Sequence, residues 1–253
     1  MRSVCWLSIG FALVAACGGG GGSNAGKAGT GAGDPGSSDS AKGVTTLEPD
    51  SAGSRTPGSG SRTTVLMVGT SLTAGLGLDP EEAYPALLQR KADSLGLHVD
   101  FVNAGLSGET SAGALRRIDW LLRGPADVVV IETGANDGLR GLNVDSTRAN
   151  LRAIITKVKA ARPAARILLA QMEAPPNLGA KYTAAFSAMY QDVAKEAAVS
   201  LMPFLLEGVA GVTSLNQPDG IHPNERGEQI VADNVWATLE PLLRELDATP
   251  TVS

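Results

Sequence analysis

The stretch "TTVLMVGTSLTAGLGL", residues 63–78, contains four consecutive apolar side chains, Val65 to Val68, and then changes to Gly69-Thr70-Ser71. A short, continuously apolar run is typical of a strand buried on both faces of a parallel sheet. Similar runs follow at "LHVDFVNAG" (97–105), "DVVVIETG" (127–134), "ARILLAQM" (165–172) and "SLMPFLL" (200–206). The sequence therefore predicts a central sheet of about five strands.

Helical patterns alternate with these runs. Apolar residues recur about every three or four positions in 81–95, 110–123, 146–161, 180–198 and 225–246. Strand and helix in alternation predict an α/β fold, in which helices cover both faces of a parallel sheet through right-handed crossovers. Ligands of such sheets bind outside the carboxyl ends of the strands, and Ser71 follows the first of these ends.

The N-terminal residues have the composition of a targeting segment. Residues 2–17, "RSVCWLSIGFALVAAC", place a charge before an apolar run too short to span a bilayer. Leu13 to Cys17 resembles a bacterial lipobox, which implies acylation of Cys17 and export to a membrane of the bacterial cell envelope, at its periplasmic or outer-membrane face. An ordinary signal peptide cleaved near Ala16 is the alternative.

Residues 18–62 contain fourteen glycines and almost no large apolar side chains, which predicts a disordered tether before a single domain at 63–253. Both cysteines precede residue 18, so the domain has neither a disulfide nor a cysteine-ligated zinc site. Of 21 basic and 26 acidic residues, 16 and 22 lie in 63–253. A net charge of −6 argues against nucleic-acid binding.

Several interpretations of Ser71 are possible. The segment "GTSLTAGLG" has neither the lysine and spacing of a phosphate-binding loop nor the spacing of a dinucleotide-binding loop. A serine that caps the following helix remains possible. A nucleophilic serine is the third interpretation, and it requires a base, usually histidine.

The domain contains two histidines. His98 begins a predicted strand, and we expect it to lie at the surface. His222 lies in "NQPDGIHPNERG", three residues after Asp219, where the acid could orient the imidazole as in a Ser-His-Asp triad. An Asx turn would explain the same spacing.

A nucleophile also needs hydrogen-bond donors for the oxyanion that it generates. Gly105 and Gly108 follow the second predicted strand in "VNAGLSGETS", and Asn136 follows the third in "IETGANDGLRG". The Gly108 N–H and the Asn136 amide could donate. Taken singly, each residue is also explained by a turn, in which glycine permits a positive φ and asparagine bonds the local backbone.

Together, the blocks that contain Ser71, Gly108, Asn136 and His222 resemble those of the SGNH (GDSL-type) hydrolases over nearly all of 64–245. The segments "ETGANDGLRG", "AFSAMY" and "DGIHPN" are most similar to the branch of bacterial arylesterases, acyl-thioesterases and lysophospholipases. The resemblance implies a flavodoxin-like three-layer α/β/α sandwich and no metal or organic cofactor. One departure is that Thr70 stands where the family usually has aspartate.

For the site, the resemblance implies that Ser71 is the nucleophile, His222 the base and Asp219 the acid that orients the base. The oxyanion hole would consist of Ser71 N–H, Gly108 N–H and the Asn136 side chain. The substrate would be a small ester, a thioester or a lysophospholipid.

An apolar acyl groove is expected in the loops 137–143 and 173–181, lined by Leu139, Leu142, Pro176 and Leu178, unless these residues only pack the loops. One alternative function is an SGNH carbohydrate or peptidoglycan O-acetylesterase, which the low aromatic content of 4% disfavours. Another is a lipoprotein that binds a ligand without catalysis. The sequence does not determine the oligomeric state.

Overall fold

The structure is a computed structural model that describes residues 62–247. The expected signal peptide, Cys17 and all of the expected tether except Arg62 lie outside the described residues. Within the described part of the chain, no helix is long and apolar enough to cross a membrane.

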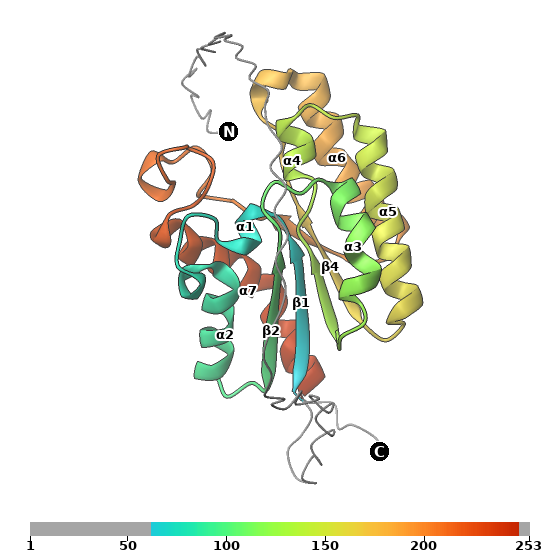
Figure 1. Ribbon diagram of the computed structural model, residues 1–253, viewed down its shortest axis with the longest axis vertical. Coiled ribbons are helices and arrows are strands. Elements are labelled where there is room, and N and C mark those ends of the chain that lie inside the picture. Colours follow the sequence, from blue (N-terminus) through green and yellow to red (C-terminus); the bar gives the residue numbers. More distant parts are fainter. Residues whose placement is uncertain (1–61, 248–253) are drawn as a thin grey trace, which may run out of the picture. The chain divides into compact units, whose positions relative to one another are not determined.

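Five parallel strands form one sheet in the order β2-β1-β3-β4-β5 (Figure 1). The strands are β1 (Thr63–Gly69), β2 (Val99–Gly105), β3 (Val128–Ile131), β4 (Arg166–Gln171) and β5 (Ser200–Phe204). The predicted parallel sheet is confirmed. Because β1 has β2 on one side and β3 on the other, the strand order reverses at β1, and the loops after β2 and β3 flank the loop after β1.

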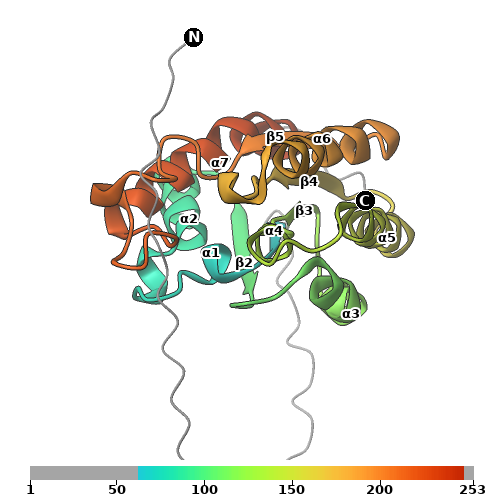
Figure 2. The ribbon, with the colours of Figure 1, turned by 90° about the horizontal axis from the view of Figure 1, so that it is seen from above.

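Helices cover both faces of the sheet, which makes three layers (Figures 1 and 2). On one face α2 (Tyr84–Ser94) packs against α7 (Glu225–Asp247), and on the other α5 (Val144–Ala161) packs against α3 (Ser111–Leu121) and α6 (Ala180–Glu196). All five are helices that the sequence predicts.

Two short helices, α1 (Ser71–Ala74) and α4 (Ala135–Leu139), were not expected. They lie above the sheet when it is seen from the carboxyl ends of its strands (Figure 2). Helices of four and five residues are too short to display a periodic apolar pattern. Three 3₁₀ turns, Pro80–Glu82, Pro176–Leu178 and Thr213–Leu215, escape prediction for the same reason.

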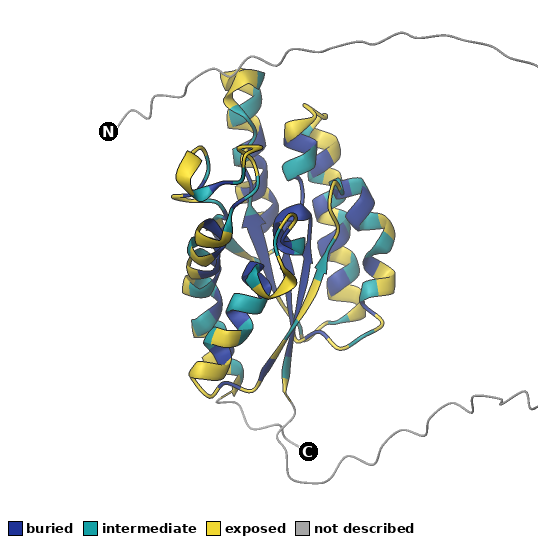
Figure 3. Cartoon of the chain, turned by 60° about the vertical axis from the view of Figure 1, so that its left-hand side comes forward, coloured by how far each residue is buried: buried dark blue, intermediate teal, exposed yellow. Residues whose placement is uncertain are grey.

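The central strands form the core, as the dark blue ribbon of Figure 3 shows. Val65 and Met67 are fully buried, whereas Val102 on β2 is 43% exposed. Burial on both faces therefore holds for β1 and not for β2, because β2 is an edge strand. Gln89 of α2 covers part of that edge: its amide donates to Val99 O (2.9 Å) and accepts from Phe101 N (3.0 Å).

Candidate active site

Ser71 lies at the carboxyl end of β1 as the first residue of α1. The Thr73 side chain packs directly against Gly69, since a Cβ atom on Gly69 would lie 1.9 Å from Thr73 Oγ1, so only glycine fits there. Ser71 is 7% exposed. Its hydroxyl does not cap α1, since the cap position is Thr70 and no side chain there bonds the helix. The capping interpretation of Ser71 is therefore wrong.

Instead, Ser71 Oγ lies 2.9 Å from His222 Nε2, across 151 positions of sequence. His222 is presented by a narrow turn that leads into α7. An antiparallel bridge between Asn216 and Pro223 closes this turn, and Gln217 N donates to His222 O at 2.7 Å. The imidazole is thus held at a short distance from the serine by backbone pairing.

Asp219 contacts the other side of the imidazole. Its Oδ2 lies 2.6 Å from His222 Nδ1, while Oδ1 accepts from the backbone N–H of Ile221 (2.9 Å) and of His222 (3.0 Å). Asp219 therefore forms an Asx turn and contacts the imidazole at the same time. Partial burial raises the pKa of Asp219, but the hydrogen bonds from His222 and Ile221 outweigh it and lower that pKa below its ordinary value. An ionised acid at this position stabilises a positive imidazole.

His98 is elsewhere. It precedes β2 at the opposite end of the sheet, its side chain is 68% exposed, and its Nδ1 lies 3.8 Å from Asp247 Oδ1. The expectation that His98 is a surface residue is confirmed.

Gly108 and Asn136 lie in the loops that flank the loop of Ser71. Gly108 has φ +77, a conformation that favours glycine. Among the hydrogen bonds of the described residues, none uses the backbone N–H of Ser71 or of Gly108. Asn136 belongs to α4 and its Nδ2 donates to Glu109 O at 3.0 Å, which occupies one of its two N–H groups.

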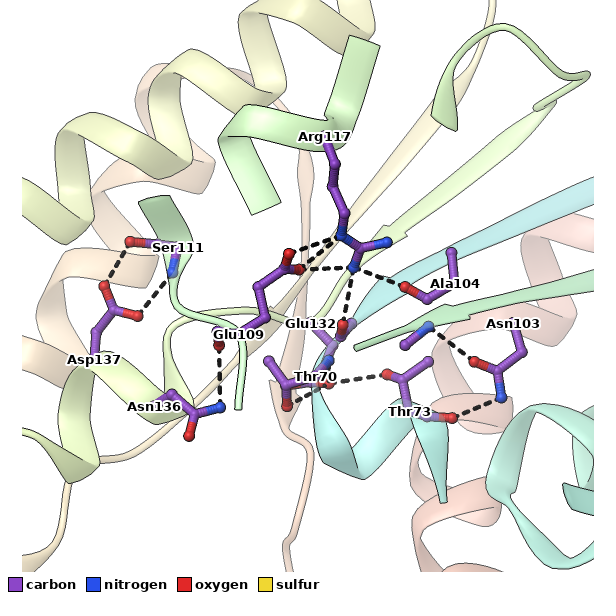
Figure 4. Close-up of polar contacts among 12 residues, drawn as sticks. Thr70, Thr73, Asn103, Ala104, Glu109, Ser111, Arg117, Glu132, Asn136 and Asp137 are labelled. Atoms are coloured by element: carbon purple, nitrogen blue, oxygen red, sulfur yellow. Dashed lines mark hydrogen bonds and ion pairs between the residues drawn. The ribbon is translucent and has the colours of Figure 1, made fainter. Parts of the chain in front are cut away.

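A buried carboxylate that the sequence did not indicate, Glu132, contacts the residue before Ser71. Glu132 follows β3, is 0% exposed, and accepts from Thr70 N (2.7 Å), Thr70 Oγ1 (3.0 Å) and Thr73 Oγ1 (2.9 Å) (Figure 4). Burial raises its pKa to about 7, although hydrogen bonds from Thr70 and Thr73 oppose that shift. The Thr70 hydroxyl can donate to Glu132, which an ionised aspartate at this position could not do.

The buried polar contacts continue away from Ser71. Thr73 Oγ1 lies 2.6 Å from the Tyr84 hydroxyl, and Tyr84 N donates to Glu228 Oε2 at 2.8 Å. Burial raises the pKa of Glu228 to about 8. The only sequence signal for Glu132 and Glu228 was a carboxylate within an otherwise apolar pattern, because their partners are distant in sequence.

Gln217 joins the segment after α1 to the turn of His222. The sequence did not indicate this role either. Gln217 Nε2 donates to Leu76 O (2.7 Å), just beyond α1, and to Pro223 O (2.9 Å) beside the histidine. A Cβ atom on Gly77 would lie 2.3 Å from Gln217 Oε1, so glycine is needed for this approach.

The two loops expected to bind the substrate lie side by side. Leu178 Cδ2 would lie 3.5 Å from a Cβ atom on Gly141, and the Tyr182 hydroxyl donates to Leu142 O at 2.7 Å. Leu139 and Leu142 are 45% and 40% exposed, and Pro176 is exposed as well. In residues 62–247 no group of three His, Cys, Asp or Glu side chains could hold a metal ion.

Comparison with known proteins agrees with this geometry. Residues 67–230 match the GDSL-like Lipase/Acylhydrolase family. The chain is 45% identical over 182 residues to Esterase TesA of Pseudomonas aeruginosa, covering 71% of this chain and 89% of that one. It is 42% identical over 181 residues to Thioesterase 1/protease 1/lysophospholipase L1 of Escherichia coli K12, covering 71% and 85%.

Among solved structures, the esterase EstA from Pseudoalteromonas sp., inhibited by monoethylphosphonate, is 37% identical with a TM-score of 0.69, and the match covers 72% of this chain and 99% of EstA. The family match spans the turn of Ser71, the loops of Gly108 and Asn136, and the turn of His222. This chain therefore belongs to the GDSL-like lipase/acylhydrolase family, the SGNH hydrolases, and is a serine ester hydrolase.

Proposed function

We propose that this chain hydrolyses carboxylic esters and thioesters through an acyl intermediate on Ser71. The observation that carries the proposal is the linked series Ser71 Oγ, His222 Nε2 and Nδ1, and Asp219 Oδ2, with distances of 2.9 and 2.6 Å. Relatives named as an esterase, as a thioesterase/lysophospholipase and as an arylesterase support aryl esters, acyl thioesters and lysophospholipids as the substrates.

In this mechanism Ser71 Oγ attacks the carbonyl carbon while His222 Nε2 takes the hydroxyl proton. Asp219, held by two backbone N–H groups, orients the imidazole and stabilises its positive charge. The proton then passes to the leaving oxygen or sulfur, and the acyl group stays on the serine. Water, deprotonated by His222, attacks the acyl-enzyme and releases the acid.

The negative charge that develops on the carbonyl oxygen requires donors. We assign this role to the Ser71 N–H, the Gly108 N–H and the Asn136 side chain. The first two have no acceptor among the described residues, and Asn136 retains one N–H beyond its bond to Glu109. Donors already in place act without reorganisation as the charge forms.

The acyl chain is assigned to the surface formed by the loops 137–143 and 173–181. Leu139 and Leu142 are exposed there, and Leu178 packs beside Gly141. Exposed leucines in the segment that follows Asn136 provide apolar area that a longer acyl chain can cover.

An acyl-chain profile with p-nitrophenyl esters, together with Ser71→Ala, tests the function. We expect hydrolysis of acetate and longer esters and loss of turnover in the variant. Full turnover by Ser71→Ala would contradict the mechanism. A preference for acetylated xylan over all p-nitrophenyl esters would favour the O-acetylesterase alternative.

Leu139→Asp tests the acyl surface. Octanoate hydrolysis should lose more kcat/KM than acetate hydrolysis, because only the longer chain reaches this side chain. Leu95→Asp is the matched control, since Leu95 is 48% exposed and lies just after α2, before β2 begins. Equal losses for both esters would remove Leu139 from the acyl surface.

We further propose that the full-length protein is exported and anchored to the cell-envelope membrane by lipid on Cys17. The lipobox pattern from Leu13 to Cys17 supports this proposal.

A further inference from the structure

Arg117 of α3 makes a compact set of contacts with Glu109, the residue after Gly108, and with Ala104 (Figure 4). Its Nε donates to both carboxylate oxygens of Glu109 (2.8 and 2.9 Å), and its Nη2 donates to Glu109 Oε2 (2.7 Å). The Glu109 side chain is 5% exposed and the Arg117 side chain 20%. This ion pair is the least exposed of those found among the described residues.

The same Nη2 also donates to two backbone carbonyls, Ala104 O at 2.8 Å and Gly69 O at 3.2 Å. Gly69 ends β1 two residues before Ser71, and Ala104 is the next-to-last residue of β2. One guanidinium group therefore joins the ends of the two strands that lead to Ser71 and to Gly108.

Glu109 is linked to the other two oxyanion donors. It directly follows Gly108 in sequence, and its carbonyl oxygen accepts from Asn136 Nδ2 at 3.0 Å. All three proposed donors are thus linked to this ion pair. Ser71 lies two residues after Gly69, whose carbonyl accepts from Arg117. Gly108 directly precedes Glu109, and Asn136 is hydrogen-bonded to the Glu109 carbonyl.

The local sequence accommodates this pair. A Cβ atom on Gly113 would lie 2.6 Å from Glu109 Cγ, so any larger residue at position 113 would displace the Glu109 side chain. Ser111 fixes the far side of the loop, because its N and Oγ donate to Asp137 at 2.8 and 2.6 Å, and Asp137 is the neighbour of Asn136.

We propose that Glu109 and Arg117 are positioning residues for the oxyanion hole: their ion pair holds the Gly108 loop, the end of β1 and the Asn136 amide in one fixed arrangement. This proposal rests on the proposed function, since it assumes those donors. Arginine suits the role because its planar fork can bind a carboxylate and two carbonyls at once, whereas lysine offers a single point charge. Small displacements of oxyanion donors are sufficient to slow an acyl transfer.

Arg117→Lys and Glu109→Gln test the proposal in the full-length chain, with p-nitrophenyl butyrate as substrate. We expect kcat to fall about ten- to a hundredfold while KM stays within about twofold, because misplaced donors weaken transition-state binding more than substrate binding. Inactivation by a p-nitrophenyl phosphonate ester should slow by a similar factor, since that reaction also builds negative charge at the oxyanion hole. Glu109→Gln retains an oxygen that can accept a hydrogen bond from Arg117. It is therefore the milder change, and it tests the proposal if Arg117→Lys fails to fold.

The double variant should lose no more than the more affected single variant, because the two residues act as one unit. The control is Arg148→Lys, which alters the Arg148–Asp192 ion pair (2.9 Å) between α5 and α6; among the described residues Arg148 has no hydrogen bond to Gly108, Glu109 or Asn136. Its kcat should stay within about twofold of wild type.

Two results would overturn the positioning role: wild-type kcat in folded Glu109→Gln and Arg117→Lys, or losses of kcat that only follow the unfolded fraction in thermal melts. Ser71→Ala, measured in parallel, separates these results from a failure of the proposed function. If Ser71→Ala is inactive while both pair variants keep wild-type kcat, the mechanism stands and the pair does not position it. If Ser71→Ala is active, the proposed function itself is wrong.

Discussion

Replacing Glu132 by glutamine should remove a large part of the pH dependence of stability. The Glu132 carboxylate is fully buried, and its hydrogen bonds come from Thr70 and Thr73, with no ion pair among the described side chains. Burial therefore raises its pKa from 4.5 to about 7 in the folded protein. Glutamine has nearly the same shape, stays neutral at every pH, and can accept from Thr70 N through its oxygen while its amide faces Thr70 Oγ1.

The magnitude follows from linkage. Below pH 4.5 both the folded and the unfolded chain keep the proton on Glu132, and no stability is lost. Between pH 4.5 and about 7 the unfolded chain releases this proton and the folded chain keeps it, so the free energy of unfolding falls as pH rises. A shift of about 2.5 pH units corresponds to about 3 kcal/mol, all of which is lost above the folded pKa.

Urea unfolding, followed by circular dichroism from about pH 4.5 to about pH 8.5, measures this difference. Relative to Glu132→Gln, the wild-type protein should lose about 3 kcal/mol across the range. The contribution of Glu228, whose pKa burial raises to about 8, is common to both proteins and cancels to first order. Glu81→Gln controls for removing a carboxylate from the surface, since that side chain is 87% exposed. A wild-type minus Glu132→Gln difference that stays constant within about 0.5 kcal/mol would refute the assignment of a buried, protonated Glu132.

Three further predictions concern catalysis and anchoring. His222→Ala should lower kcat by several orders of magnitude and His98→Ala should leave it near wild type, because only His222 contacts Ser71; an inactive His98→Ala enzyme would contradict the triad. Asn136→Ala should lower kcat about a hundred- to a thousandfold with little change in KM, whereas a lowered melting temperature with wild-type kcat would make Asn136 purely structural. Cys17→Ala should move the full-length protein from the membrane to the soluble fraction, and an unchanged membrane-bound fraction would count against lipidation.

The order of the elements was predictable because it depends on local patterns. Continuous apolar runs and three-to-four-residue periodicity identified all five strands and the five long helices, including β1, whose bounds agree with the run 63–69. The candidates Ser71 and His222 were also predictable, since a serine at a strand end and a histidine near an aspartate are visible in the chain itself.

The sequence by itself thus determined the α/β class, the succession of elements and the residue types able to perform acyl transfer. Only the tertiary structure decided the contacts that hold these residues in place. Glu132 meets Thr70 across 62 positions, and Ser71 meets His222 across 151. Arg117 donates to Gly69 O, 48 positions earlier in the chain. Such contacts carry no local periodic signal, because they arise where parallel strands that are distant in sequence end at the same edge of the sheet. The type of a residue determines which chemical roles its side chain can perform, and the fold determines which backbone and carboxylate groups that side chain contacts.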